Sequence, residues 1–230
     1  MNKFVLMAVV ALALFSCAQE VEESDRSVQE RILNAYVDLN CPQAKRLDNG
    51  IVMMESLEGT GDTLNKYESG FFKYSIRTLG GLYSETNEEE LAKVLGWYSN
   101  SNYYGPKLYE IGYNRNYAGL EDVMYKMREG GKVSFILPPW MTYTSDENSW
   151  NLNFSTIYEL ELKEVVNNIL TWQQDTMKAY ARTHYPGLDT LKSNFYFKML
   201  HDAGTDTIDN GTVKVRYVGR LLDGWYLIPI

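Results

Sequence analysis

The side chains best suited to form a site in this chain are apolar and aromatic. The stretch LEDVMYKMREGGKVSFILPPWMTYT, residues 120–144, spaces Leu120, Val123 and Met127 along one face of a short helix and follows them with a Pro-Pro loop and Tyr143. Such residues act by contact and by hydroxyl hydrogen bonds. The sequence therefore directs attention to binding, and away from nucleophilic or metal chemistry.

Composition argues against two classes of function. The 230 residues carry 30 acidic and 22 basic side chains, a formal charge of -8 that repels a phosphate backbone, so we expect no nucleic-acid partner. Two cysteines and two histidines are too few for a convincing structural zinc site. The sequence indicates no metal and no cofactor; the four residues are Cys17, Cys41, His184 and His201.

Strand patterns surround this helix. KVSFILP (132–138) is rich in strand formers, and TIYELELKEV (156–165) alternates between two faces. One face of the second segment carries Tyr158, Leu160 and Leu162, and the other carries Ile157, Glu159 and Glu161. We expect an α+β fold, in which a twisted antiparallel sheet wraps around one short helix.

Two longer helices are predicted on either side of this region. Residues 28–40 place apolar side chains at helical spacing, with Ser27 as N-cap and Glu30 at the capping-box position. Residues 165–184 form the second helix, which Pro186 and Gly187 end.

The two helices open an internal repeat with an offset of 144 residues. Each helix leads into an apolar strand (50–57 and 194–200), a Gly-Thr-Asp turn and an aromatic strand (70–81 and 211–224). The second unit is therefore predicted to be a partial copy of the first. Six identities share the offset: Ala35, Tyr36, Pro42, Leu47, Asp62 and Thr63 match Ala179, Tyr180, Pro186, Leu191, Asp206 and Thr207.

The first residues indicate export. MNKFVLMAVVALALFSC places Lys3 before an apolar run of about a dozen residues, which is signal-peptide length. LFSC resembles the lipobox of bacterial lipoproteins, which makes Cys17 the lipidated first residue after removal of a signal peptide, 1–16. Two alternatives are an ordinary cleaved signal and a disulfide between Cys17 and Cys41. The acidic residues 17–27 are predicted to be a tether.

Residues 70–162 resemble the FKBP-type peptidyl-prolyl isomerase domain. The matching segments are FFKYSIRTLGGLYS, PKLYEIG (106–112), AGLEDVMYKM (118–127), REGGKVSFILPPWMTYT and STIYELELKEV (155–165), and the match needs no gap from Pro106 to Thr144. The resemblance implies an FKBP-like sheet around a short helix in residues 28–164, a linker helix at 165–187 and a partial second FKBP-like unit at 188–230.

The resemblance also implies a pocket that holds a proline ring. Catalytic positions carried over from the family are Tyr74, Tyr83, Leu120, Tyr143 and Tyr158, and binding positions are Tyr109 and Tyr117. Four positions depart from the family pattern. Ser84 replaces an Asp, Leu120 a Trp of the pocket floor and Lys107 an aromatic residue, and Asn116-Tyr117 replaces a Val-Ile pair.

An insertion between Thr86 and Pro106 begins with a possible short helix and continues into aromatic residues. Trp97 and Tyr104 belong to this second part and are candidate binding residues, because aromatic side chains on loops often form binding surfaces. The alternative is that its rings fill the space left by the missing Trp and close the pocket; the rings are Trp97, Tyr98, Tyr103 and Tyr104.

Two functions remain open. An FKBP-type isomerase of the cell envelope would act on proline-containing peptides or exported proteins, since rotation about an X-Pro bond needs a dry pocket but no nucleophile. A non-catalytic FKBP-like lipoprotein would use the same cleft to hold a peptide or protein. In both, a lipid at Cys17 places the protein on the periplasmic or surface side of a bacterial membrane.

Overall fold

The computed structural model describes residues 24–112, 118–125, 127–141, 154–190, 195–198, 201, 204 and 210–224. The predicted Cys17 anchor, the signal peptide and Tyr117 and Tyr143 lie outside these residues. Among the described residues, no helix is long and apolar enough to cross a membrane.

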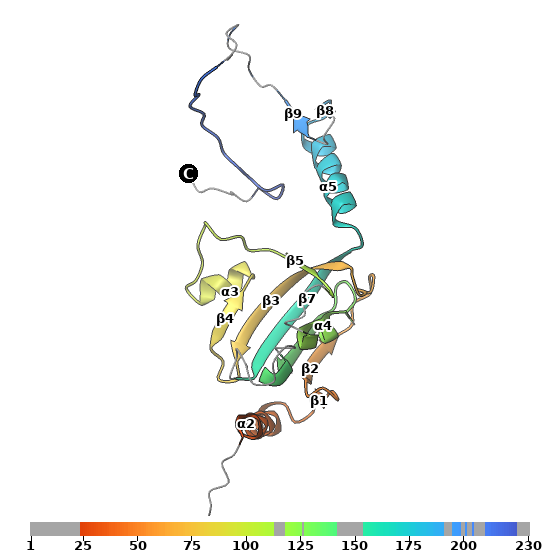
Figure 1. Ribbon diagram of the computed structural model, residues 1–230, viewed down its shortest axis with the longest axis vertical. Helices are drawn as coiled ribbons and strands as arrows, with labels where there is room; N and C mark the ends of the chain where they lie inside the picture. Colours follow the sequence, from red (N-terminus) through yellow and green to blue (C-terminus); the bar gives the residue numbers. More distant parts are fainter. Residues whose placement is uncertain are drawn as a thin grey trace, which may run out of the picture.

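One antiparallel sheet organises the chain (Figure 1). Its strands follow the spatial order β1-β2-β6-β7-β3-β4, and β5 pairs with β3 beside β4. The strands are β1 (Lys45–Arg46), β2 (Val52–Leu57), β3 (Ser69–Thr78), β4 (Tyr83–Thr86), β5 (Lys107–Glu110), β6 (Lys132–Leu137) and β7 (Thr156–Val166). The predicted α+β fold, a curled antiparallel sheet around a short helix, is confirmed.

The centre of the sheet is the long ladder between β3 and β7, which runs from Ser69 opposite Val166 to Thr78 opposite Thr156. Side chains alternate across it as the sequence predicts. Tyr158, Leu160 and Leu162 face helix α4 (Ala118–Met124) and belong to the main core. Inside this core, Phe72, Phe135 and Leu137 are almost fully buried. We call this side of the sheet the inner face.

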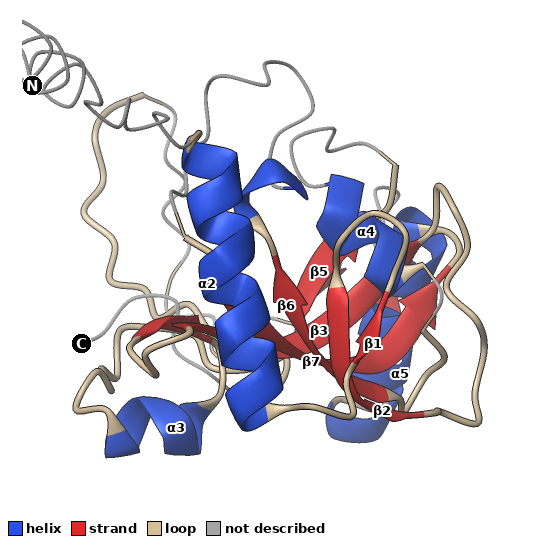
Figure 2. Ribbon diagram, turned by 90° about the horizontal axis from the view of Figure 1, so that it is seen from below, coloured by secondary structure: helices blue, strands red, loops and turns tan. Residues whose placement is uncertain are grey.

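The opposite side, the outer face, is partly covered by helix α2 (Asp25–Asn40), as Figure 2 shows. A smaller core forms where Leu33 of α2 meets Val52, Ile136 and Ile157 of the sheet. The turn η2 (Pro139–Met141) contacts both cores, because Trp140 packs on the smaller one and Met141 on the main one.

Both predicted helices begin elsewhere than expected. The side chain of Ser24, and not that of Ser27, caps α2 and accepts a hydrogen bond from the backbone N–H of Ser27. The helix therefore includes an additional polar turn.

The second helix, α5 (Ile169–His184), begins after Asn168, whose side chain caps it. The expected start at residue 165 is wrong because Val165 and Val166 continue the β7 ladder. The ring of Trp172 packs on Phe71 of β3 at 4.8 Å between ring centroids and joins the first turn of α5 to the sheet.

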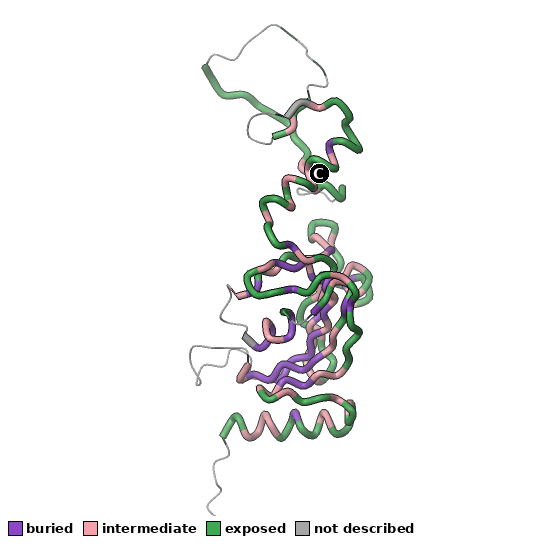
Figure 3. The backbone as a smooth tube through the Cα atoms, turned by 90° about the vertical axis from the view of Figure 1, so that its right-hand side faces the viewer, coloured by how far each residue is buried: buried purple, intermediate pink, exposed green. Residues whose placement is uncertain are grey.

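Residues 188–230, the predicted partial second unit, contain less regular structure in their described part than the sequence predicts. Strands β8 (Asp189–Thr190) and β9 (Tyr196–Phe197) pair, but the expected strand at 211–224 is absent from these described residues. Figure 3 shows this segment as exposed. Its side chains alternate like those of a strand, yet Val215 and Tyr217 remain largely exposed. Among the residues that the structure describes, no strand pairs with this segment, and strand propensity alone does not bury a strand.

Candidate functional site

A pocket of about 480 Å³ lies between α4 and the inner face of the sheet. We call it the inner pocket. Its wall is mainly apolar and aromatic, with hydroxyl and charged groups at one side. The lining residues are Phe72, Tyr74, Ile76, Thr78, Ser84, Glu85, Lys107, Leu108, Tyr109, Leu120, Met124, Phe154, Thr156 and Tyr158.

Four of the predicted site residues meet in this pocket. Tyr74 comes from β3, Tyr109 from β5, Leu120 from α4 and Tyr158 from β7, so four elements distant in sequence contribute one side chain each. Antiparallel alternation explains the convergence, since residues two apart on a strand share a face.

The remaining predicted residues are placed differently. Tyr83 does not line the pocket; it pairs with Arg77, whose side chain lies on the outer face. Trp97 and Tyr104 belong to the insertion and also do not line it. Tyr117 and Tyr143 lie outside the described residues.

The wall of the pocket is rigidly packed. The ring of Tyr158 stacks on Phe135, with ring centroids 5.4 Å apart and an angle of 13° between the ring planes. Leu120 and Met124 of α4 close the opposite side and are buried. Stacked rings and buried aliphatic chains fix the shape of a cavity before a ligand arrives, which favours binding of an apolar ring.

The polar side of the pocket is a group of three side chains that we call the rim triad: Tyr74, Glu85 and Lys107. The Tyr74 hydroxyl donates a hydrogen bond to the Glu85 carboxylate. Lys107 Nζ donates to the Tyr74 hydroxyl at 3.0 Å, lies 3.6 Å from Glu85 Oε1, and sits 5.4 Å from the centroid of the Tyr74 ring. One ammonium, one carboxylate and one phenol thus hold each other in place.

The contacts within the rim triad also influence the protonation of Tyr74 and Lys107. Partial burial, followed by the hydrogen bond to Glu85, raises the pKa of Tyr74, so the phenol is neutral at physiological pH. The hydrogen bond to Tyr74 raises the pKa of Lys107, which is therefore an ammonium. Both groups act as hydrogen-bond donors over the whole physiological range of pH, and neither is a general base.

Glu85 was not among the residues predicted from the sequence. In the family pattern Ser84 stands where an Asp is usual, but the carboxylate that reaches Tyr74 belongs to the next residue. The cause is an irregularity in register between β3 and β4, where Ile76 pairs with Glu85 and Arg77 with Tyr83. An extra residue on one strand moves the following side chain to the other face. The proximity of an acidic residue to Ser84 was the available signal.

The insertion contains α3 (Glu89–Val94), as its first part predicts. Its aromatic part packs on itself. The rings of Tyr98 and Tyr104 stack at 5.3 Å between centroids, and the Tyr104 hydroxyl donates to the carbonyl oxygen of Trp97 at 3.1 Å. None of its rings lines the inner pocket. The alternative that they close the pocket is therefore wrong.

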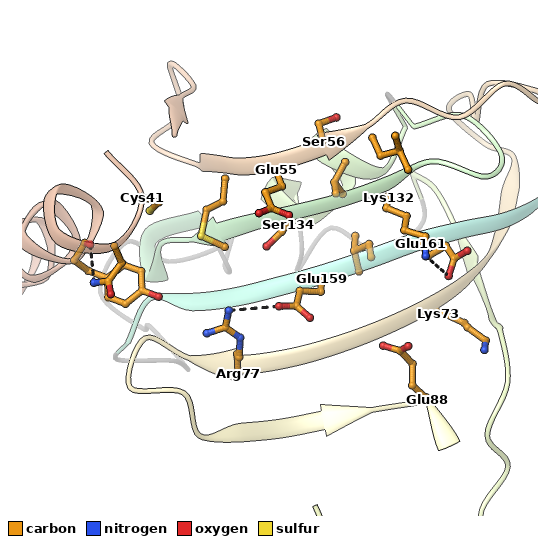
Figure 4. A pocket seen from close by; sticks show the side chains of 16 residues that line it. Cys41, Glu55, Ser56, Lys73, Arg77, Glu88, Lys132, Ser134, Glu159 and Glu161 are labelled. Carbon is orange, nitrogen blue, oxygen red and sulfur yellow. Dashed lines mark hydrogen bonds and ion pairs between the residues drawn. The ribbon is translucent and has the colours of Figure 1, made fainter. Parts of the chain in front are cut away.

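A larger cavity, about 750 Å³, lies on the outer face beside the end of α2 (Figure 4). Charged side chains line it and pair with one another. Arg77 lies 3.4 Å from Glu159, and Lys132 lies 3.5 Å from Glu161. Cys41 at its edge has a pKa raised by burial, which disfavours the reactive thiolate. We interpret this groove as a solvated, ion-paired face.

In the described part of the chain, no group of three or more His, Cys, Asp or Glu side chains is arranged to hold a metal ion. The inner pocket combines an apolar and aromatic wall with the hydrogen-bonded side chains of the rim triad.

No family model and no curated sequence matches the chain. Solved structures that it is similar to include FKBP-type peptidyl-prolyl isomerases. The peptidyl-prolyl cis-trans isomerase of Pseudomonas syringae is 17% identical over 63% of this chain and 98% of its own, with a TM-score of 0.44.

Two further structures have similar values. FkpA from Escherichia coli is 17% identical over 73% of this chain and 83% of its own, with a TM-score of 0.41. The three FKBP domains of wheat FKBP73 are 17% identical over 51% of this chain and 46% of their own, with a TM-score of 0.37. At this level of identity, the similarities do not assign a function to the chain.

Proposed function

We propose that the chain binds proline-containing peptides in the inner pocket and accelerates the cis–trans isomerisation of their X-Pro bonds. The observation that carries this proposal is the convergence of Tyr74, Tyr109, Leu120 and Tyr158 on one cavity of about 480 Å³. Aromatic and aliphatic walls hold a pyrrolidine ring by dispersion and water exclusion.

The reaction needs no covalent step. The barrier to rotation is about 18 to 20 kcal/mol, because the C–N bond has partial double-bond character. A planar amide is more polar than a twisted one, so a pocket that removes water from the amide disfavours the planar form more than the twisted form. Donors fixed at the rim then stabilise the twisted carbonyl or nitrogen without reorganising.

Lys107 is the donor that we expect to meet the substrate. The Tyr74 proton is already donated to Glu85, whereas an ammonium has three protons and the rim triad provides it with two acceptors. Because Lys107 lines the pocket, its remaining proton is available to solvent or to a bound peptide. A carbonyl of the peptide next to proline is a suitable acceptor.

A second function, binding without isomerisation, is favoured by the same residue. An ammonium at the wall keeps water near the amide, and desolvation is the main contribution that we ask of the pocket. In that case the pocket holds a prolyl segment of a partner protein, and the rim triad fixes its direction.

A protease-coupled rate assay on a short Leu-Pro peptide, with peptide affinity measured in parallel on the full chain, separates the two. We expect the wild-type chain to accelerate isomerisation of the peptide. Leu120→Ala should lower the affinity for the peptide about tenfold or more, because the Leu120 side chain forms part of the pocket wall. The matched control is Leu33→Ala, the same change in the outer core. Binding without acceleration supports the second function, and no binding contradicts both.

We further propose that the protein is an envelope lipoprotein anchored through Cys17. The basis is the apolar leader followed by LFSC and an acidic tether. Expression in a Gram-negative host with radiolabelled palmitate should give a labelled chain that partitions into detergent. Cys17→Ser should abolish both signals, whereas Cys41→Ser should keep them; unlabelled wild-type protein would contradict the anchor.

A further inference from the structure

One edge of strand β3 has two partners along its length. β5 pairs with its first part, from Ser69 to Phe72, and β4 pairs with its last part, from Ser75 to Arg77. Neither ladder includes Tyr74, which lies between them. The chain leaves this edge after β4, forms the insertion and returns as β5, so the gap at Tyr74 is where the two ends of the insertion approach β3.

The side chain of Asn87 fills this gap. Its Oδ1 accepts a hydrogen bond from the Tyr74 backbone N–H at 2.7 Å. Its Nδ2 donates to the carbonyl oxygens of Phe72 at 2.8 Å and Gly105 at 2.9 Å. The carboxamide thus supplies the acceptor and the donor that a neighbouring strand would supply, and one of its bonds joins the far end of the insertion.

Burial makes these bonds consequential. Asn87 is 1% exposed, and its own backbone N–H donates to the Tyr74 carbonyl oxygen at 3.2 Å. A polar side chain this deeply buried persists because its hydrogen bonds are satisfied. Truncation to alanine removes the side-chain acceptor of the Tyr74 N–H and a donor from each of two carbonyl oxygens. Water can replace these partners only if the ends of the insertion move away from β3.

Those ends carry two members of the rim triad, Glu85 and Lys107. Glu85 lies two residues before Asn87, Lys107 lies two residues after Gly105, and both reach the hydroxyl of Tyr74. We infer that Asn87 is a positioning residue of the inner pocket, which holds the arms carrying Glu85 and Lys107 against Tyr74. The functional importance of this role rests on the proposed function, because the rim triad is the part of the pocket expected to contact a prolyl peptide.

The fold itself should survive loss of Asn87. β3 keeps its full ladder with β7 on its other edge, from Ser69 to Thr78, and the main core does not include Asn87. The expected defect is therefore a displaced rim on an intact sheet. This separates a positioning role from a general structural role.

The first test follows the phenol of Tyr74 by NMR in protein labelled at the tyrosine ζ carbon. Asn87→Ala should lower the pKa of Tyr74 towards its ordinary value, because both burial and the hydrogen bond to Glu85 are weakened. Leu33→Ala, which destabilises the outer core, should leave the titration unchanged. An unchanged titration in folded Asn87→Ala protein overturns the inference. If that variant does not fold, Asn87→Asp, which keeps the acceptor and loses both donors, is used in its place.

The second test is a double-mutant cycle on binding of a fluorescent Leu-Pro peptide. We expect Asn87→Ala to weaken binding about fivefold, and Lys107→Met to have a smaller effect in the Asn87→Ala background than alone. Additive effects overturn the inference. Absence of binding by the wild-type chain contradicts the proposed function instead, and the Tyr74 titration then still decides the role of Asn87.

Discussion

The two faces of the central sheet show how one set of strands forms two different surfaces. On β7, Tyr158 and Leu160 join the main core, whereas Glu159 and Glu161 line the outer groove. The outer cavity is the larger, about 750 against 480 Å³, but charged side chains line it, and four of them form two ion pairs, Arg77 with Glu159 and Lys132 with Glu161. The chemistry and close packing of its wall, and not its volume, therefore distinguish the inner pocket as the candidate site.

The largest test of this comparison is a pair of neighbouring substitutions on β6. Phe135→Ala on the inner face should lower the free energy of unfolding by about 3 to 5 kcal/mol, because a fully buried ring leaves a cavity. Ser134→Ala on the outer face should change it by about 0.5 kcal/mol or less. Urea denaturation measures both. Similar losses for the two variants would contradict the assignment of the faces.

A smaller effect is expected from the ion pairs of the outer groove. Burial opposes ionisation of Glu161, but Lys163 and Lys132 outweigh it and lower its pKa. Because the pKa of Glu161 is lower in the folded state than in the unfolded state, its contribution to stability is present above the unfolded-state pKa. That contribution disappears as pH falls through the folded-state pKa. Glu161→Gln should therefore cost about 1 kcal/mol or less at neutral pH, and less still in high salt.

The corresponding measurement is the pH dependence of unfolding with and without this substitution. The difference between wild type and Glu161→Gln should narrow only on acidification below pH 4.5. A constant difference down to pH 2 would contradict the ion-pair account.

The smallest effect on stability should come from Lys107→Met, because this side chain is half exposed. Its expected signature is in titration. Lys107 lowers the pKa of Tyr74, so its removal should raise that pKa further above the ordinary value. A group whose pKa is raised in the folded state stabilises the fold below its unfolded-state pKa, and this stabilisation is lost as pH rises through the folded-state pKa. In Lys107→Met, the stabilisation by Tyr74 should therefore persist to higher pH. Lys163→Met is the control, and a fall in the Tyr74 pKa would contradict the rim triad.

The inner face was predictable because burial imposes a period of two on its strands. The period of two places Tyr158 on the inner face, and Tyr74, Leu120 and Tyr158 line one cavity as the resemblance to the FKBP family implied. Glu85 was missed, and Tyr83 does not reach the pocket, because the irregular register between β3 and β4 has no periodic signature.

The less predictable parts depend on partners that are distant in sequence. The segment 211–224 has strand propensity, but a strand exists only as part of a ladder. Ser24 and Ser27 are chemically alike, so local pattern could not decide which of them caps α2. The rim triad forms only because β5 pairs with the same edge of β3 as β4 does, and local sequence does not reveal this pairing.

The hydrogen bond between the Asn87 side chain and Gly105 also has a consequence for the evolution and engineering of the chain. It holds the two ends of the insertion next to each other. The distance between these ends therefore does not depend on the length of the loop that joins them. For a flexible loop, each doubling of length costs only about 0.6 kcal/mol in closure entropy. Residues 88–104 are therefore a place where new sequence can be grafted, shortened or exchanged while the scaffold beneath is kept.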